Sequence, residues 1–254
     1  MHIPVEARSL RGRVGRGALA AVAAAGMLAG APPAVRAADV AVFGGGEAQS
    51  HRQGYVYLGA DVTTPLNSWL SLDGRVVPHF LTYKFRSGGE LVRADVPGID
   101  AAAGLKATFD ERTYATLLAG VQLRDKELTP DPGGNTTRGV IVGPLVVGEF
   151  GTTFPSRTSL SYFGSFSGAD SFIYQKVTVK QQVTNLDYAR PNTINLGPEL
   201  IYGRNADFNM VGAGAVVELY SLPWRLSVAA RVGYRHDSTF GDGIYTGLSF
   251  YRAF

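Results

Sequence analysis

The segment 224–235 alternates apolar and polar side chains with a period of two, and this pattern constrains the fold more than any other feature. One phase is entirely apolar and runs from Trp224 to Tyr234. The other phase holds Arg225, Arg231 and Arg235, with only serine, alanine and glycine between them. Successive side chains of a β-strand point to opposite faces. The segment is therefore predicted to be a strand with one apolar and one polar environment.

The length of this apolar stripe and its aromatic ends are typical of a strand that crosses a membrane. A strand of a soluble sandwich also alternates, but three arginines on one face and aromatic caps on the other favour the membrane strand. Similar alternation recurs at 56–62, 99–109, 115–123 and 211–219. Lipid cannot satisfy an open sheet edge, so these strands are expected to close into one antiparallel transmembrane β-barrel.

Turn residues divide the chain into segments of strand length. Short turns are predicted at 65–68, 110–112, 154–157, 185–191 and 221–223, and longer polar loops alternate with them at 48–53, 87–97, 127–138, 168–171, 204–207 and 236–243. This gives twelve strands, with ten as the alternative: 39–47, 54–64, 69–86, 98–109, 113–126, 139–152, 158–167, 172–184, 193–203, 208–220, 224–235 and 244–254. Alternating short turns and long loops are typical of outer-membrane barrels.

Residues 1–37 have the pattern of a cleaved secretory signal peptide. Four early arginines precede an uncharged stretch of small and apolar residues from Ala18 to Gly30, and Ala37 ends a short region of small residues. This stretch is too short to span a bilayer as a helix, and two prolines follow it. The barrel is accordingly predicted to occupy 38–254, in the outer membrane of a Gram-negative bacterium and in contact with its lipid.

The positive charge of the chain belongs mainly to this leader. The whole sequence has 24 basic and 21 acidic residues, of which 1–37 contain five arginines and one glutamate. The remaining 217 residues therefore carry a net charge of −1. Nucleic-acid binding needs a clustered positive surface, so no nucleic-acid partner is expected. The absence of cysteine excludes disulfides and thiolate chemistry.

Two features test the strand assignments. Pro78, Pro144 and Pro198 fall inside predicted strands, where a closed barrel offers no free edge, so bulges or local errors in the spans are expected. Aromatic residues are expected to form a girdle at the short-turn ends: Trp69, Phe109, Phe150, Tyr220, Trp224 and Phe254.

The polar phase of each strand is predicted to line the lumen. Its candidate residues are Tyr55, Tyr57, Asp61, Asp73, Arg75, His79, Tyr83, Asp100, Lys106, Tyr114, Arg124, Glu149, Glu199, Glu218, Arg225, Arg231 and Arg235. Two interpretations remain open. The charges form pairs that stiffen the wall, or they line a polar conduit, since twelve strands lie between filled eight-stranded and open sixteen-stranded barrels.

The sequence indicates neither a catalytic site nor a metal site. His51 and His236 fall in predicted outer loops, and His79 is expected to face inward, but no serine motif accompanies any of them. Asp125, Glu127 and Asp131 do not have the spacing of an EF-hand loop. We expect no catalytic residue, no metal and no cofactor, and keep a barrel enzyme acting on outer-membrane lipid as the alternative.

Three stretches resemble one protein family. These are Phe43–Ala48 followed by Tyr55–Gly59, the stretch Gly120–Asn135 with its Asp-Pro-Gly segment, and Leu196–Ile201 with nearby Gly203, Asn205 and Asp207. In this order they are similar to the cellulose biosynthesis protein BcsS family, over essentially the whole chain after the leader.

The resemblance implies an envelope component associated with bacterial cellulose synthesis, acting as a pore or an accessory protein. A glucan chain and the envelope components of cellulose synthase would be its partners, and Pro198 would belong to the family pattern. A glucan conduit would use inward hydroxyl groups, carboxylates and aromatic faces. A general small porin is the second alternative.

We predict that the protein isolated from membranes begins at Ala38, or at Asp39 if cleavage occurs one residue later. Mass spectrometry of the purified protein measures this directly. A protein that retains residues 1–37 would contradict the predicted leader.

Overall fold

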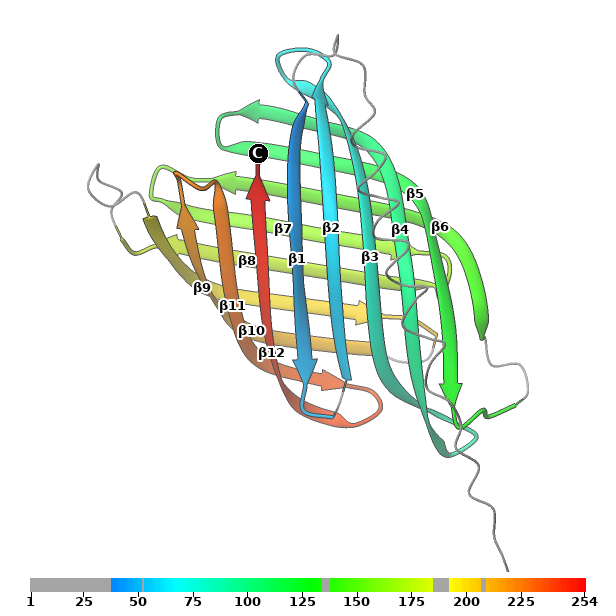
Figure 1. Ribbon diagram of the computed structural model, residues 1–254. Coiled ribbons are helices and arrows are strands. Elements are labelled where there is room, and N and C mark those ends of the chain that lie inside the picture. Colours follow the sequence, from blue (N-terminus) through cyan, green and yellow to red (C-terminus); the bar gives the residue numbers. More distant parts are fainter. Residues whose placement is uncertain (1–37, 52, 134–137, 185–191, 207–208) are drawn as a thin grey trace, which may run out of the picture. The chain divides into compact units, whose positions relative to one another are not determined.

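A computed structural model describes residues 38–51, 53–133, 138–184, 192–206 and 209–254 of the chain. These residues form a closed antiparallel barrel of twelve strands (Figure 1). The strand number agrees with the prediction of twelve and not with the alternative of ten. The predicted leader and the predicted turn at 185–191 lie outside the described residues.

The twelve strands vary in length from 10 to 21 residues. Their bounds are β1 Asp39–Gln49, β2 Gln53–Pro65, β3 Leu70–Ser87, β4 Glu90–Asp110, β5 Thr113–Thr129, β6 Gly139–Thr153, β7 Thr158–Ser167, β8 Phe172–Gln182, β9 Asn192–Arg204, β10 Asn209–Ser221, β11 Leu226–Asp237 and β12 Gly241–Ala253.

Each strand pairs with its neighbours in sequence, and the first strand pairs with the last. The closing ladder runs from Ala41 opposite Ala253 to Gln49 opposite Tyr245. Beyond it, the amide of Phe254 donates to the carbonyl of Val40 at 2.8 Å. In Figure 1, β1–β4 run steeply along the near wall, and β7–β9 cross behind them. The described part of the chain contains no helix that is long and apolar enough to cross a membrane.

The period-two pattern sorts side chains as predicted through most of the barrel. Leu117, Val232 and Leu248 point outward and are more than half exposed. On the same strands, Thr116 and Arg235 point inward and are buried, and Arg231 is half-buried. This distribution suits a lipid-facing outer surface and a polar interior.

The predicted loop at 87–97 is wrong. Residues 90–97 belong to β4, which joins β3 through a turn at Gly88 and Gly89, with φ of 58° and 87°. Here Val92, Ala94 and Val96 point inward and are fully buried, while the charged residues of the segment point outward. The pattern is thus reversed relative to the strands with an apolar outer face, and its outward charges made the segment resemble a loop.

Other strand ends also differ from the predicted spans. β5 continues to Thr129, so the start of the predicted 127–138 loop is strand. The predicted loop at 236–243 shortens to 238–240, because β11 runs to Asp237 and β12 begins at Gly241. The predicted 48–53 loop shortens in the same way between β1 and β2.

The three prolines are accommodated without bulges. The β2–β3 ladder is interrupted beside Pro78, and the β8–β9 ladder beside Pro198, and both resume in the same register. Pro144 lies one residue beyond the end of the β6–β7 ladder, and its carbonyl accepts from Gly168 at 2.7 Å. A register shift occurs instead between Thr108 and Asp110. Proline has no backbone N–H, and at each of these three positions the ladder on one side of the strand is interrupted or ends.

The aromatic girdle forms in part at the short-turn ends. Trp69, Phe109, Trp224 and Phe254 are each more than half exposed there, whereas Phe150 and Tyr220 are half-buried. Trp224 lies in the turn before β11 and not in the strand. The guanidinium of Arg252 lies 4.7 Å from the centre of the Phe254 ring.

Gly104 marks a close approach between β4 and β5. A Cβ atom there would lie 2.0 Å from the carbonyl oxygen of Leu117, whereas a Cβ at Gly148 would meet nothing within 4 Å. We predict that Gly104→Ala lowers the free energy of unfolding by about 3 kcal/mol, and that Gly148→Ala has little effect. Urea unfolding in detergent measures both. Equal losses in the two variants would contradict this account of the packing.

Candidate functional site

The barrel encloses a cavity of about 890 Å³, and the inward side chains of nearly every strand line it. All of the lumen candidates predicted from the sequence contact this cavity. The inward phase predicted from the alternation thus faces this cavity. The functions of these residues stay predictions, and the contacts among them decide which groups are available.

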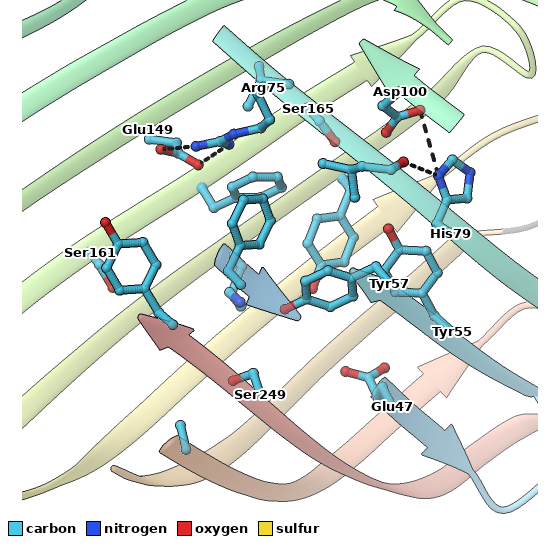
Figure 2. Close-up of a pocket in the computed structure, with 18 of the residues that line it drawn as sticks. Glu47, Tyr55, Tyr57, Arg75, His79, Asp100, Glu149, Ser161, Ser165 and Ser249 are labelled. Atoms are coloured by element: carbon cyan, nitrogen blue, oxygen red, sulfur yellow. Dashed lines mark hydrogen bonds and ion pairs between the residues drawn. The ribbon is translucent and has the colours of Figure 1, made fainter. Parts of the chain in front are cut away.

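Arg75 on β3 is the centre of an ionic bridge across the interior. It makes two bonds to Asp61 on β2, at 2.7 and 3.0 Å, and two to Glu149 on β6, at 2.5 and 3.1 Å. Figure 2 shows the Arg75–Glu149 pair. The guanidinium also lies 5.3 Å from the ring centre of Phe43. Since β4 and β5 separate β3 from β6, this bridge ties together strands that are not neighbours.

His79 on β3 lies in a second polar group. Its Nδ1 lies 3.3 Å from the carbonyl of Val77 and 3.7 Å from Asp100 on β4. Gln122 on β5 donates to the same Asp100 carboxylate at 2.5 Å. A Cβ at Gly98 would lie 2.5 Å from Nε2 of His79. The glycine thus leaves the space that the imidazole ring fills.

A line of aromatic rings covers the wall formed by β1 and β2, and we call it the aromatic platform: Phe43, Tyr57 and Tyr55. Neighbouring ring centres are 6.3 Å apart for Phe43 and Tyr57 and 5.3 Å for the stacked Tyr57 and Tyr55. Tyr55 continues the line to His79 at 5.9 Å. Figure 2 shows Tyr55 and Tyr57 beside each other in the cavity.

Further rings line the cavity on β7 and β8. The ring of Tyr174 lies 6.0 Å from Phe163 and 6.4 Å from Phe172. Phe43, Phe163 and Tyr174 were not among the predicted lumen residues. Their parity along each strand could have identified them, because Tyr174 shares the inward phase with Lys176 and Lys180.

The turn between β7 and β8 folds inward at one end of the cavity. Asp170 in this turn lies 3.6 Å from both Arg124 and Lys126 on β5, and Tyr83 on β3 donates to it at 3.5 Å. Tyr83 also belongs to a buried hydrophobic cluster with Phe85, Val92, Ala94 and Val96. Arg124 and Tyr83 are therefore tied into packing at this end.

The wall formed by β8–β11 carries most of the remaining charges. Arg235 forms an ion pair with Glu47 of β1, and Lys180 forms one with Glu218. The hydroxyl of Tyr245 donates to Glu199 at 3.0 Å. Glu47 and Tyr245 were missed among the predicted site residues, although both follow the inward phase of their strands.

The remaining predicted lumen residues lie outside the groups described above. Asp73 accepts a hydrogen bond from Thr63 at 3.3 Å, and the ammonium of Lys106 lies 5.2 Å from the ring centre of Tyr114. Arg231 donates to Ser249 at 2.8 Å. Arg225 is exposed at the cavity edge and has a positive φ of 45°.

Two histidines contact Asp242 at the rim of the barrel, where β11 joins β12. Nδ1 of His236 lies 2.9 Å from the carboxylate of Asp242, and Nε2 of His51 lies 3.1 Å from the carbonyl of the same residue. Across the described ranges, the histidine and acidic side chains form no group of three or more that could hold a metal ion.

Comparison with solved structures defines the class of protein. The barrel is similar to the beta domain of the Bordetella autotransporter BrkA, with a TM-score of 0.52 at 11% identity, covering 85% of this chain and 98% of that one. The translocator domain of the autotransporter NalP from Neisseria meningitidis matches with a TM-score of 0.47 at 10% identity, covering 93% and 95%. The match to the BrkA domain, with a TM-score above 0.5, shows the fold of an outer-membrane β-barrel.

The sequence defines the family. The model of the cellulose biosynthesis protein BcsS family matches residues 41–254, and the chain belongs to this family. No curated protein matches the chain. The family resemblance seen in the three sequence stretches is confirmed.

We predict that Arg75→Gln lowers the free energy of unfolding by about 2–3 kcal/mol, between the values for exposed and fully buried ion pairs. The substitution leaves Asp61 and Glu149 facing the cavity without their cation. Thermal unfolding in detergent measures the loss, and Arg252→Gln at the exposed rim is the control.

Neutralising the two acids in the same variant, as Asp61→Asn and Glu149→Gln, is expected to restore part of the lost stability, because no uncompensated charge then remains. A triple variant that is less stable than Arg75→Gln alone would contradict this electrostatic explanation.

Proposed function

We propose that this chain is a non-enzymatic barrel of the outer membrane whose lumen binds a segment of an uncharged glucan during cellulose biosynthesis. Family membership supports the pathway. The apolar outer surface and the exposed aromatic residues at the short-turn ends support the location, since lipid-facing strands carry such girdles at both interfaces.

The aromatic platform is the observation that carries the proposal. A β-glucan presents apolar C–H faces edged by hydroxyl groups. The stacked rings of Tyr57 and Tyr55 and the ring of Phe43, tilted by 51° from Tyr57, offer apolar surface within the cavity. Inward carboxylates and phenol hydroxyls provide hydrogen-bonding partners around it. Both kinds of contact suit a sugar ring.

The size and shape of the cavity favour binding over free diffusion. A volume of about 890 Å³ lies within the ~300–1,000 Å³ of small-molecule sites. The Arg75 bridge joins β3 to β6 inside it. These features favour a site for a short stretch of glucan, in an accessory or conducting component, over a general small porin.

One observation favours the second candidate, an enzyme acting on outer-membrane lipid. The His236–Asp242 pair has the geometry of a base held by a carboxylate. In the part of the chain that the structure describes, however, no serine hydroxyl is hydrogen bonded to His236 or His51. Loss of lipid-hydrolysing activity in His236→Ala would favour the enzyme, and absence of such activity in the native protein would exclude it.

We predict that cellotetraose binds the purified barrel and that Tyr57→Ala weakens binding by about tenfold, because a stacking ring is lost. Isothermal titration calorimetry in detergent measures the affinity. Tyr202→Ala, which removes an outward tyrosine on β9, is the matched control, and Tyr57→Phe is expected to keep most of the affinity.

Planar-bilayer conductance separates the glucan site from a porin. A glucan site predicts a current, if one flows, that cellotetraose blocks and maltotriose does not. A large current that neither sugar changes, together with no calorimetric signal, would overturn the proposal in favour of the porin.

A further inference from the structure

Charge is distributed unequally between the two sides of the cavity. We call the cavity-lining side chains of β8–β11 the basic wall. With Arg225 of the β10–β11 turn included, it carries five cations and two carboxylates: Lys176, Lys180, Arg225, Arg231, Arg235, Glu199 and Glu218. The cavity-lining residues of β2–β6 include four carboxylates and three cations: Asp61, Asp73, Asp100, Glu149, Arg75, Lys106 and Arg124.

The carboxylates near the basic wall are already engaged. Glu218 pairs with Lys180 and accepts from Asn195 at 3.1 Å. Glu199 accepts from Tyr245, and Glu47 of β1 pairs with Arg235. These contacts leave cations on this wall without a carboxylate in contact.

Among the described residues of this wall, Lys176, Arg225 and Arg231 have no carboxylate in contact. Arg225 is exposed at the cavity edge, whereas Lys176 and Arg231 lie further inside. Among the described residues, Lys176 has neither a hydrogen bond nor an ion pair, although Arg231, Glu199 and Glu47 lie within its electrostatic reach. Arg231 donates to Ser249, but its Nε is shielded from solvent and has no acceptor. Both side chains line the same cavity. Two cations that interact there and are partly removed from water are stabilised when an anion lies between them.

We propose that Lys176 and Arg231 form an anion-binding subsite in the lumen, which takes a carboxylate or phosphate group. Lys176 belongs to β8 and Arg231 to β11, so an anion held by both would bridge two strands that are not neighbours. With Arg235, Glu47 and Glu199, these residues make a group with three cations and two carboxylates, and one anion neutralises the surplus. The anion is either a free inorganic ion or an acidic group on a saccharide.

The saccharide form of this ligand rests on the proposed function, whereas the anion subsite does not. Calorimetry with three probes distinguishes the anion subsite from the glucan-binding function. The probes are inorganic phosphate, neutral cellobiose, and cellobionate, which adds one carboxylate to a similar disaccharide. We expect cellobionate to bind about tenfold more tightly than cellobiose, because its carboxylate adds one charge-assisted contact. Lys176→Gln and Arg231→Gln are each expected to abolish this difference.

The matched control is Lys106→Gln, which removes a cation from the opposite wall and is expected to leave the difference intact. Lys176→Arg keeps the charge and is expected to keep the preference, which separates charge from folding defects. Unheated electrophoresis of each variant verifies that the barrel has folded.

The outcomes are distinct. Phosphate binding that depends on Lys176 and Arg231, with no binding of either saccharide, supports the subsite and contradicts the proposed glucan function. Cellobiose binding without any gain for cellobionate, and without phosphate binding, overturns the subsite and leaves the glucan function standing. An equal loss of preference in Lys106→Gln also overturns the assignment to these two residues.

Discussion

The ladder between β1 and β12 is the contact on which the rest of this structure depends. A sheet in lipid has no water to satisfy its edge N–H and C=O groups, so it must close on itself. The nine residue pairs from Ala41–Ala253 to Gln49–Tyr245 perform this closure. Because the sheet is closed, the inward phase of every strand faces the same enclosed space. Residues as distant in sequence as Glu47 and Arg235 can then form one ion pair.

Closure also explains the organisation of the interior. Charged side chains that leave water need partners, and many of those here find them on a different strand. Arg75 joins β2, β3 and β6, and Asp170 brings the β7–β8 turn against Arg124 and Lys126. This pairing occupies much of the polar lining. It leaves Lys176 and Arg231 without a carboxylate in contact, and the aromatic platform also lines the cavity.

The sense of the alternation changes along the longest strands, and this change limited the prediction of the strand ends. Between Ile99 and Phe109, β4 has small and apolar residues outward and charges inward. Between Leu91 and Val96 it has charges outward and buried Val92, Ala94 and Val96 inward. The second arrangement is that of a sheet whose outer face meets water. A polar outward face looks like a loop when lipid exposure is assumed, which is why 87–97 was assigned wrongly.

The sequence by itself determined the strand number, the closure and the identity of most lumen residues, because a period of two assigns each side chain to a face without reference to other strands. The family followed from three short stretches in order. Only the tertiary structure decided which inward charges are paired across the barrel. Glu149 of β6 joins Arg75, Glu47 of β1 joins Arg235, and Asp170 joins two cations of β5, and no local pattern relates these strands and turns. It also decided that Pro78 and Pro198 interrupt ladders without a bulge, since register depends on both strands of a pair. The site therefore depends on strand stagger around a closed sheet, which is a property of the whole barrel and not of any segment.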